Sequence, residues 1–79
     1  MRIDKYLKTS RIIKRRSVAA DACDAGKVTI NGKTAKPSST IALGDIIEIN
    51  FNSKIIKLKV EQVTEHSTKE SAENMYSLL

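Results

Sequence analysis

The sequence predicts an α+β fold, in which two short amino-terminal helices pack on a small, twisted, mostly antiparallel sheet and a short helix lies near the carboxyl terminus. Three observations predict it. Apolar residues recur at helical spacing before Gly26, they alternate with polar residues after it, and Asn31-Gly32 marks a tight hairpin. With 79 residues the chain has room for one small domain, which excludes a two-domain enzyme.

The first helix is expected over residues 2–8. Ile3, Tyr6 and Leu7 recur at helical spacing and form an apolar face that anchors it. The cations on its other side are Arg2, Lys5 and Lys8. This helix therefore has one face for the core and one face that is available for binding.

A basic connector, residues 11–16, follows and sets two isoleucines among four cations. Ser17 suits the N-cap of a second helix over residues 17–25, and Gly26 follows it at a position that favours glycine. The stripe expected to pack on the core consists of Val18, Ala22 and Ala25. Cys23, within the same helix, is expected to be buried and inert.

Strands are expected after the second helix. Residues 28–30 and 33–34 flank Asn31-Gly32, which accepts the positive φ angles of a two-residue turn. The later elements are a loop at 36–39, a turn at 43–45, a strand at 46–51, a turn at 52–54 and a strand at 55–63.

The carboxyl-terminal segment is expected to differ from the rest of the chain. Residues 64–68 are polar and expected to be loose, whereas residues 69–79 are expected to form a closing helix. The apolar residues of that helix are Ala72, Met75, Tyr76 and Leu79. The chain therefore divides into a domain over residues 1–63 and an extension, partly helical or flexible, over residues 64–79.

The basic charge is concentrated near the amino terminus. The net charge is +5, but residues 1–36 carry a net +7 and residues 37–79 a net −2. Such a block is typical of a phosphate-binding surface, with a solvated helix face as the simple alternative. Apolar residues within the block favour the first interpretation, because Ile3, Leu7, Ile12 and Val18 can hold the cations on one rigid surface.

Other classes of function find little support. One cysteine and one histidine (Cys23 and His66) provide neither a zinc cluster nor a nucleophile pair, and the glycines match no nucleotide-binding loop. We therefore expect no enzyme, no metal and no cofactor. There is no apolar run near the ~18 residues of a membrane span and no signal-peptide pattern, so we expect a cytoplasmic protein without a membrane partner.

The candidate RNA-binding residues follow from this charge pattern. Cations on the first helix, the connector and the hairpin are expected to converge: Arg2, Lys5, Lys8, Arg11, Lys14, Arg15, Arg16, Lys27 and Lys33. Arginines suit bidentate phosphate contacts, and we expect Arg11 and Arg16 to matter most. Tyr6, Phe51 and Tyr76 are too scattered for a base-stacking sheet, so recognition of shape and phosphate is expected.

The sequence resembles a known RNA-binding family. In order and spacing, the chain resembles the alpha-L RNA-binding motif, the domain named after bacterial ribosomal small-subunit protein S-four, at residues 2–7, Ser10-Arg11, 14–17, 26–32, Lys36-Pro37-Ser38 and Gly44-Asp45. The resemblance implies two helices and a hairpin that present a basic face to structured RNA. It also adds Asn31 to the candidate binding residues.

Among stand-alone members, the chain resembles the RqcP family of bacterial ribosome-associated quality control. That resemblance implies a factor that binds obstructed large ribosomal subunits, contacts ribosomal RNA and peptidyl-tRNA, and supports alanine tailing by an RqcH-type factor. We expect the protein to be a monomer. Three alternatives stay open: a heat-shock-type factor that recycles blocked large subunits, an accessory subunit of an RNA-modifying complex, and a protein-docking module. The docking module would use Met75, Tyr76, Leu78 and Leu79.

Overall fold

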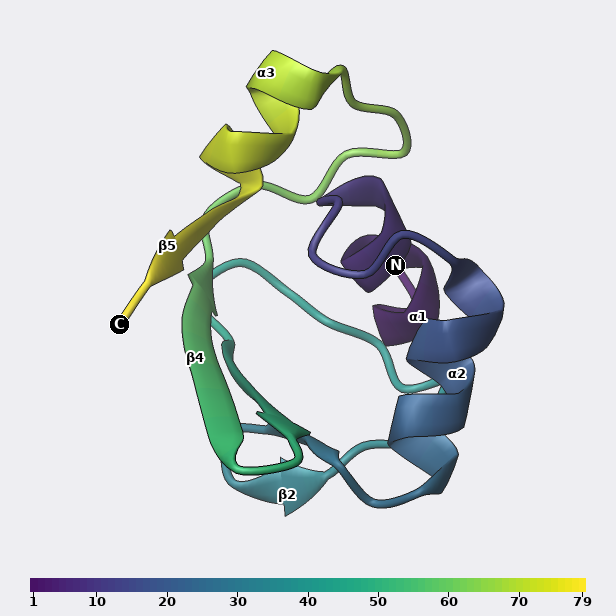
Figure 1. The fold of residues 1–79 in the computed structure, drawn as a ribbon. Helices are drawn as coiled ribbons and strands as arrows, with labels where there is room; N and C mark the ends of the chain where they lie inside the picture. Colours follow the sequence, from purple (N-terminus) through teal and green to yellow (C-terminus); the bar gives the residue numbers. More distant parts are fainter.

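The computed structural model describes all 79 residues and confirms the α+β architecture. The helical elements are α1 (Ile3–Thr9), α2 (Arg16–Asp24), α3 (Lys69–Ala72) and the 3₁₀ helix η1 (Glu73–Met75). The strands are β1 (Val28–Ile30), β2 (Lys33–Thr34), β3 (Ile46–Phe51), β4 (Lys54–Val60) and β5 (Tyr76–Leu78). They form one five-stranded antiparallel sheet in the order β2-β1-β3-β4-β5. Figure 1 shows α1 and α2 together beside the curled sheet, with α3 apart from α2 at the other end of α1.

Helix α1 forms where the apolar spacing predicts it, one residue later than expected. Ile3, Tyr6 and Leu7 are fully buried and form the centre of the core. The first backbone N–H groups of a helix lack partners within it, and here a loop supplies them. The amides of Ile3 and Asp4 donate to the carbonyls of Ser39 and Pro37, at 2.8 and 3.4 Å. The loop thereby fixes where α1 begins.

Helix α2 differs from the prediction at its start. It begins at Arg16, with Arg15 in the N-cap position and no capping side chain, so the expected capping role of Ser17 is wrong. Arg16 instead directs its guanidinium to the carboxylate of Asp4, at 3.4 Å. A tertiary contact with α1, rather than a local cap, accompanies the start of this helix.

The buried face of α2 is also different from the predicted one. Ala19 and Cys23 are buried, whereas Val18 is 46% exposed and Ala25 lies in solvent. The expectation that Val18 supports the basic surface is therefore wrong, and Ile12 is only half-buried. Small residues occupy both sides of this helix, so spacing alone does not distinguish the two faces.

The strands confirm the predicted hairpin and central pair. Asn31 and Gly32 have φ angles of 51° and 85°, and Ile30 pairs with Lys33 across the turn. Strand β4, however, ends at Val60 rather than at residue 63. The amides of the next two residues, 61 and 62, both donate to the carbonyl of Met75, at 2.8 and 3.2 Å. The regular hydrogen-bond pattern between the strands therefore ends at Val60.

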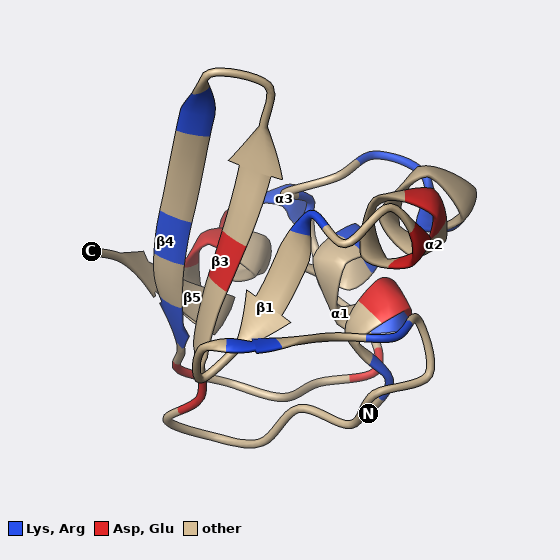
Figure 2. Ribbon diagram, turned by 90° about the horizontal axis from the view of Figure 1, so that it is seen from below, with Lys and Arg blue, Asp and Glu red and all other residues tan.

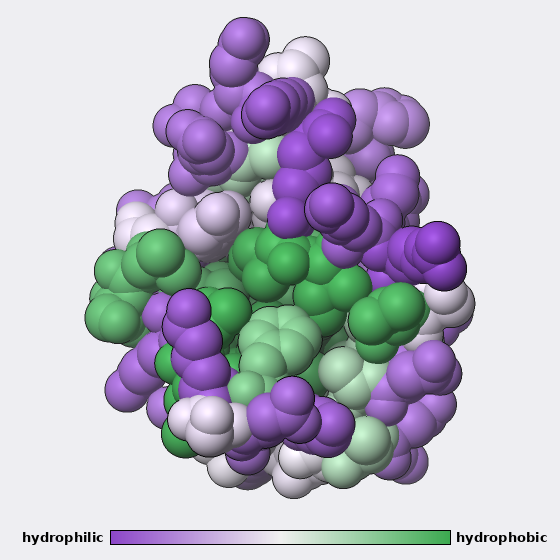
Figure 3. Space-filling model, viewed as in Figure 1, coloured by the Kyte–Doolittle hydropathy of each residue, from purple (hydrophilic) through white to green (hydrophobic).

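The carboxyl-terminal residues do not form one helix. The predicted helix over residues 69–79 divides into α3, η1 and β5, because the edge of β4 supplies backbone partners for the last segment. Leu78 pairs with Leu58 and Tyr76 with Val60. Met75 is fully buried and therefore not available for the docking alternative, whereas Leu78 and Leu79 are exposed. Figure 3, viewed as in Figure 1, shows apolar surface at the middle and at one side of the molecule, below a polar top.

Cys23 has the environment of an inert thiol. It is 3% exposed, and burial, with smaller contributions from Asp4 and Asp24, raises the pKa of its thiol to about 11. At pH 8 roughly one thiol in a thousand is then ionised, against about a quarter for a free cysteine. Burial of the neutral Cys23 thiol stabilises the folded state fully below a pH of about 8.5, and this stabilisation is lost as the pH rises through 11.

We therefore expect Cys23 to react with an aromatic disulfide reagent at least about 100-fold more slowly in the folded protein than in denaturant at pH 8. The absorbance of the released thiolate measures both rates. The unfolded chain serves as the control, since it contains the same single thiol. Labelling of the folded protein at the unfolded rate would show that the thiol is accessible and the packing of α2 is wrong.

Candidate nucleic-acid interface

Asp4 is a buried carboxylate that gathers two arginines. Its side chain is 5% exposed and lies 3.0 Å from the Nη2 atom of Arg2 and 3.4 Å from that of Arg16. It also accepts the backbone N–H of Lys5 at 2.7 Å. Both arginine side chains stay about half exposed. Asp4 therefore holds two guanidinium groups on one surface, with donors still free for a further anion.

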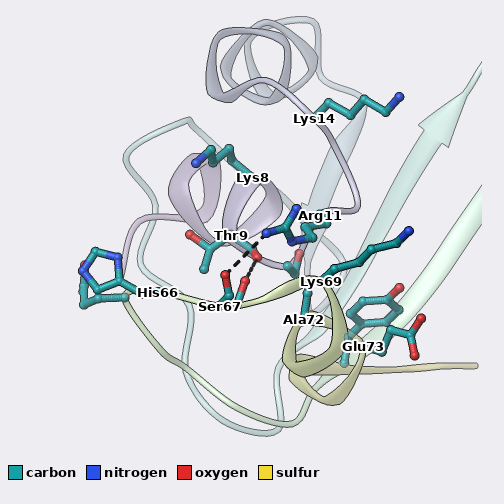
Figure 4. A pocket seen from close by; sticks show the side chains of 12 residues that line it. Lys8, Thr9, Arg11, Lys14, His66, Ser67, Lys69, Ala72 and Glu73 are labelled. Carbon is teal, nitrogen blue, oxygen red and sulfur yellow. Dashed lines mark hydrogen bonds between the residues drawn. The ribbon is translucent and has the colours of Figure 1, made fainter.

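An open groove of about 590 Å³ lies between the end of α1, the connector and the extension. Its cations come from three segments: Lys8 from α1, Arg11 and Lys14 from the connector, and Lys69 from α3. Figure 4 shows Arg11 at the centre of this arrangement, with Lys14 and Lys69 above and below it and Lys8 on the other side. The groove thus collects positive charge from parts of the chain about 60 residues apart.

Arg11 has an unusual backbone conformation. Its φ angle is 63°, a left-handed value that normally favours glycine just after a helix. Its amide donates to the carbonyl of Lys8 at 3.0 Å, and the amide of Ile13 donates to that of Leu7 at 3.1 Å, which closes the end of α1. The guanidinium then reaches across the groove to the carbonyl of Ser67, at 3.5 Å.

The extension is fastened to α1 at three points. The buried hydroxyl of Tyr6 donates to the carbonyl of Met75 at 2.6 Å, and the hydroxyl of Ser67 donates to the carbonyl of Thr9. Lys5 forms an ion pair with Glu65, and this hydrogen bond lowers the pKa of the Glu65 carboxyl. Burial, together with Tyr76 and Glu61, raises the pKa of the Tyr6 hydroxyl, so it stays a hydrogen-bond donor.

The structure places the ten predicted residues in separate groups. Lys8, Arg11 and Lys14 line the groove, Arg2 and Arg16 meet at Asp4, and Lys5 joins the extension. The remaining four are Arg15, Lys27, Asn31 and Lys33, all exposed outside the groove. Figure 2 shows that positive charge is also spread over β4 and the β1–β2 side of the molecule.

Asn31 has a structural role at the hairpin. Its amide group donates to a carboxylate oxygen of Asp45 at 3.1 Å and accepts the N–H of Ile46 at 2.9 Å. Asp45 in turn accepts the N–H of Ala42 at 2.8 Å. These bonds fix the hairpin against the start of β3 and leave the Asn31 side chain little capacity for other partners.

Sequence reasoning missed two cations that the fold brings to these surfaces. Lys69 lies in the groove, and Lys36 lines a second hollow together with Arg2. Lys36 lies two residues after the predicted hairpin strand that ends at Thr34, and this position was a usable signal. Lys69 gave none, because its position depends on the extension folding back onto α1. No group of three or more metal-ligating side chains occurs in the structure, and no helix has the length and apolar character to cross a bilayer.

Comparison with known proteins identifies relatives across the whole chain. The sequence profile of the S4 domain matches residues 1–47. A protein of Listeria innocua called RQC P-site tRNA stabilizing factor is 47% identical over 79 residues, covering 100% of this chain and 86% of the relative. The Bacillus subtilis protein of the same name is 43% identical and 92% covered. The trimeric structure of Vibrio cholerae Heat Shock Protein 15 superposes with a TM-score of 0.92 at 29% identity, covering 100% of this chain and 81% of that one.

Proposed function

This chain belongs to the S4 domain family and, within it, to the RQC P-site tRNA stabilizing factors, and from that premise we propose that it is a non-enzymatic RNA-binding factor of ribosome-associated quality control. The observation that carries the proposal is the set of groove cations without ion pairs, together with the two arginines held at Asp4, on a chain similar to these relatives over its full length. Rigid cations that face outward suit closely spaced phosphates of folded RNA.

The proposed ligand is an obstructed large ribosomal subunit that carries peptidyl-tRNA. In this proposal residues 1–63 are the RNA-binding domain of a cytoplasmic monomer, and its basic surface contacts both ribosomal RNA and tRNA. In this proposal the nine cations among the ten candidate residues contact RNA, whereas Asn31 positions the hairpin. By holding the tRNA, the protein supports alanine tailing of the stalled chain by an RqcH-type factor, which performs the chemistry.

The geometry accounts for a binding role without bond-making. The two arginines at Asp4 are held close together before any ligand arrives, so less rotamer entropy is lost on binding. The groove cations are not paired to carboxylates and can exchange water and counterions for phosphate oxygens. Affinity should therefore depend strongly on the salt concentration.

We expect Arg11→Glu to weaken co-sedimentation with large subunits carrying peptidyl-tRNA by at least about tenfold, because it removes one phosphate contact and adds repulsion. Arg11 suits charge reversal better than Arg16, whose replacement by glutamate would set a second carboxylate against buried Asp4. The measurement is the bound fraction against subunit concentration at several salt concentrations, with circular dichroism to verify the fold.

The matched control is Lys54→Glu, which reverses an exposed charge at the β3–β4 turn, outside the groove. This variant changes the net charge equally, so a general loss of positive charge would weaken both proteins alike. Unchanged binding by Arg11→Glu, or equal losses in both variants, would contradict the proposed interface. Salt-independent binding of the wild type would contradict phosphate recognition altogether.

A heat-shock-type factor that recycles blocked subunits is the second candidate. The superposition on Vibrio cholerae Heat Shock Protein 15 favours it, since that structure covers the entire chain. The two candidates differ in their ligand requirement. Two results would support tRNA stabilisation. One is tighter binding to subunits with P-site tRNA than to subunits whose tRNA has been released, and the other is alanine tailing that depends on this protein.

A further inference from the structure

We propose that the groove between α1, the connector and α3 is a binding site for an RNA phosphodiester backbone, completed by Lys69 of the extension. This inference rests on the proposed function and extends it to a part of the chain beyond the S4 profile, which ends at residue 47. The extension then forms one wall of the RNA site, in addition to its packing on the sheet.

The groove cations, which lack ion pairs, carry the argument. Among the cations near the amino terminus, Arg2, Lys5 and Arg16 form ion pairs with Asp4 or Glu65. The four groove cations form none: Lys8, Arg11, Lys14 and Lys69. Four positive charges around one hollow repel each other, and an anion that spans them removes this repulsion.

The carboxylates of the groove do not neutralise it. Glu65 is paired with Lys5, which leaves Glu73 as the one lining carboxylate without an ion pair. Figure 4 shows Glu73 at the edge of the arrangement, near Lys69 and away from Lys8. The groove therefore keeps an excess of positive charge along its length.

Lys69 is held in place before any ligand arrives. It is the first residue of α3, where Thr68 and Ser71 cap the helix reciprocally and Ala72 is buried beneath. The bond from Ser67 to the carbonyl of Thr9 fixes the chain to α1 two residues before Lys69. The base of the Lys69 side chain is thus fixed relative to the connector, so only the flexible stem loses freedom on binding.

The shape and lining of the groove favour a nucleic-acid backbone. The groove is open, and its side chains are mostly polar or charged, with Ala72 and Tyr76 as the apolar or aromatic members. An apolar ligand would find little surface to bury there. An extended strand of phosphates can pass along it and meet cations on both walls, with Tyr76 beside its path as a surface for a base.

The backbone of Arg11 gives independent support. A left-handed residue after a helix is least strained as glycine, yet here an arginine occupies it and directs its guanidinium into the groove. We therefore expect Arg11→Gly to raise the Tm or leave it unchanged, and at the same time to weaken RNA binding. Strain retained at a residue that stability does not require is typical of a binding site.

The decisive experiment compares Lys69→Gln with Lys54→Gln, a matched loss of one exposed lysine outside the groove. The probe is a large subunit carrying peptidyl-tRNA, titrated at several salt concentrations. Lys69→Gln should weaken binding by about three- to tenfold and reduce the slope of log affinity against log salt by about 0.7–0.9, the value for one phosphate contact. Lys54→Gln should behave as the wild type.

A second probe separates this inference from the proposed function. Amide chemical shifts of the wild type are followed while a single-stranded RNA oligonucleotide, or a poly-glutamate peptide of equal charge, is added. RNA-dependent shifts at residues 8–14 and 67–73 that become smaller in Lys69→Gln support the RNA site in the groove. If subunit binding fails while these shifts occur, the failure contradicts the proposed function alone. Equal behaviour of the two lysine variants with both RNA probes, or tighter binding of the peptide than of RNA, would overturn the inference.

Discussion

Replacing Tyr6 by alanine is expected to lower the free energy of unfolding by about 3–5 kcal/mol, a large fraction of the stability of a domain of 79 residues. The ring of Tyr6 is fully buried between α1, the sheet and the extension, and its removal leaves a cavity that the surrounding core fills only in part. Chemical denaturation followed by circular dichroism measures the change. Much of the variant should be unfolded near physiological temperature.

Two further variants separate the ring from its hydroxyl. Tyr6→Phe is expected to lose about 1 kcal/mol, because the carbonyl of Met75 keeps the N–H groups of Glu61 and Gln62 as donors. Tyr76→Phe removes a hydroxyl that has no hydrogen-bond partner and should change stability by less than about 0.5 kcal/mol. A loss in Tyr6→Phe as large as in Tyr6→Ala would show that the hydroxyl, rather than packing, dominates.

Asp4→Ala is expected to lower the free energy of unfolding by about 2 kcal/mol and the Tm by about 10 °C. The variant loses charge-assisted hydrogen bonds from two guanidinium groups and one backbone amide to a side chain that is 5% exposed. The loss stays moderate because Arg2 and Arg16 are half exposed and water can solvate them. Thermal unfolding measures it. If the proposed function holds, subunit binding should also weaken below the Tm, because the two arginines are no longer held together.

The control for Asp4 is Glu48, which forms an exposed pair with Lys57 at 3.8 Å. Glu48→Ala should cost less than about 0.5 kcal/mol. Asp4→Asn keeps an acceptor for the Lys5 amide and should recover part of the loss. Equal effects of Asp4→Ala and Glu48→Ala would mean that burial of the Asp4 carboxylate contributes nothing.

Local sequence signals predicted the elements whose structure is decided locally. Asn31-Gly32 predicted the hairpin because few other pairs accept two positive φ angles. The spacing of Ile3, Tyr6 and Leu7 predicted α1 and its buried face, because residues three and four positions apart lie on one side of a helix. Both signals depend on residues that are close together in the chain.

Features decided by tertiary contacts could not be predicted in this way. The buried side of α2 depends on close packing against α1, and alanines on both sides hid it. The division of the last segment into α3, η1 and β5 depends on the open edge of β4. The burial of Asp4 did have a readable signal: Asp4 lies three residues before Leu7, on the apolar face of α1, where a single carboxylate among cations indicates a buried pair.

The hydrogen bond from Tyr6 to Met75 joins residues 69 positions apart, and this separation bears on how the protein is made. During synthesis helix α1 emerges long before η1, which carries the carbonyl that Tyr6 binds. Until η1 follows, the aromatic ring at position 6 lacks this cover, and the nascent chain exposes apolar surface. The native core is therefore complete only after residue 75 has been synthesised, and removal of η1 would leave the ring of Tyr6 without this cover.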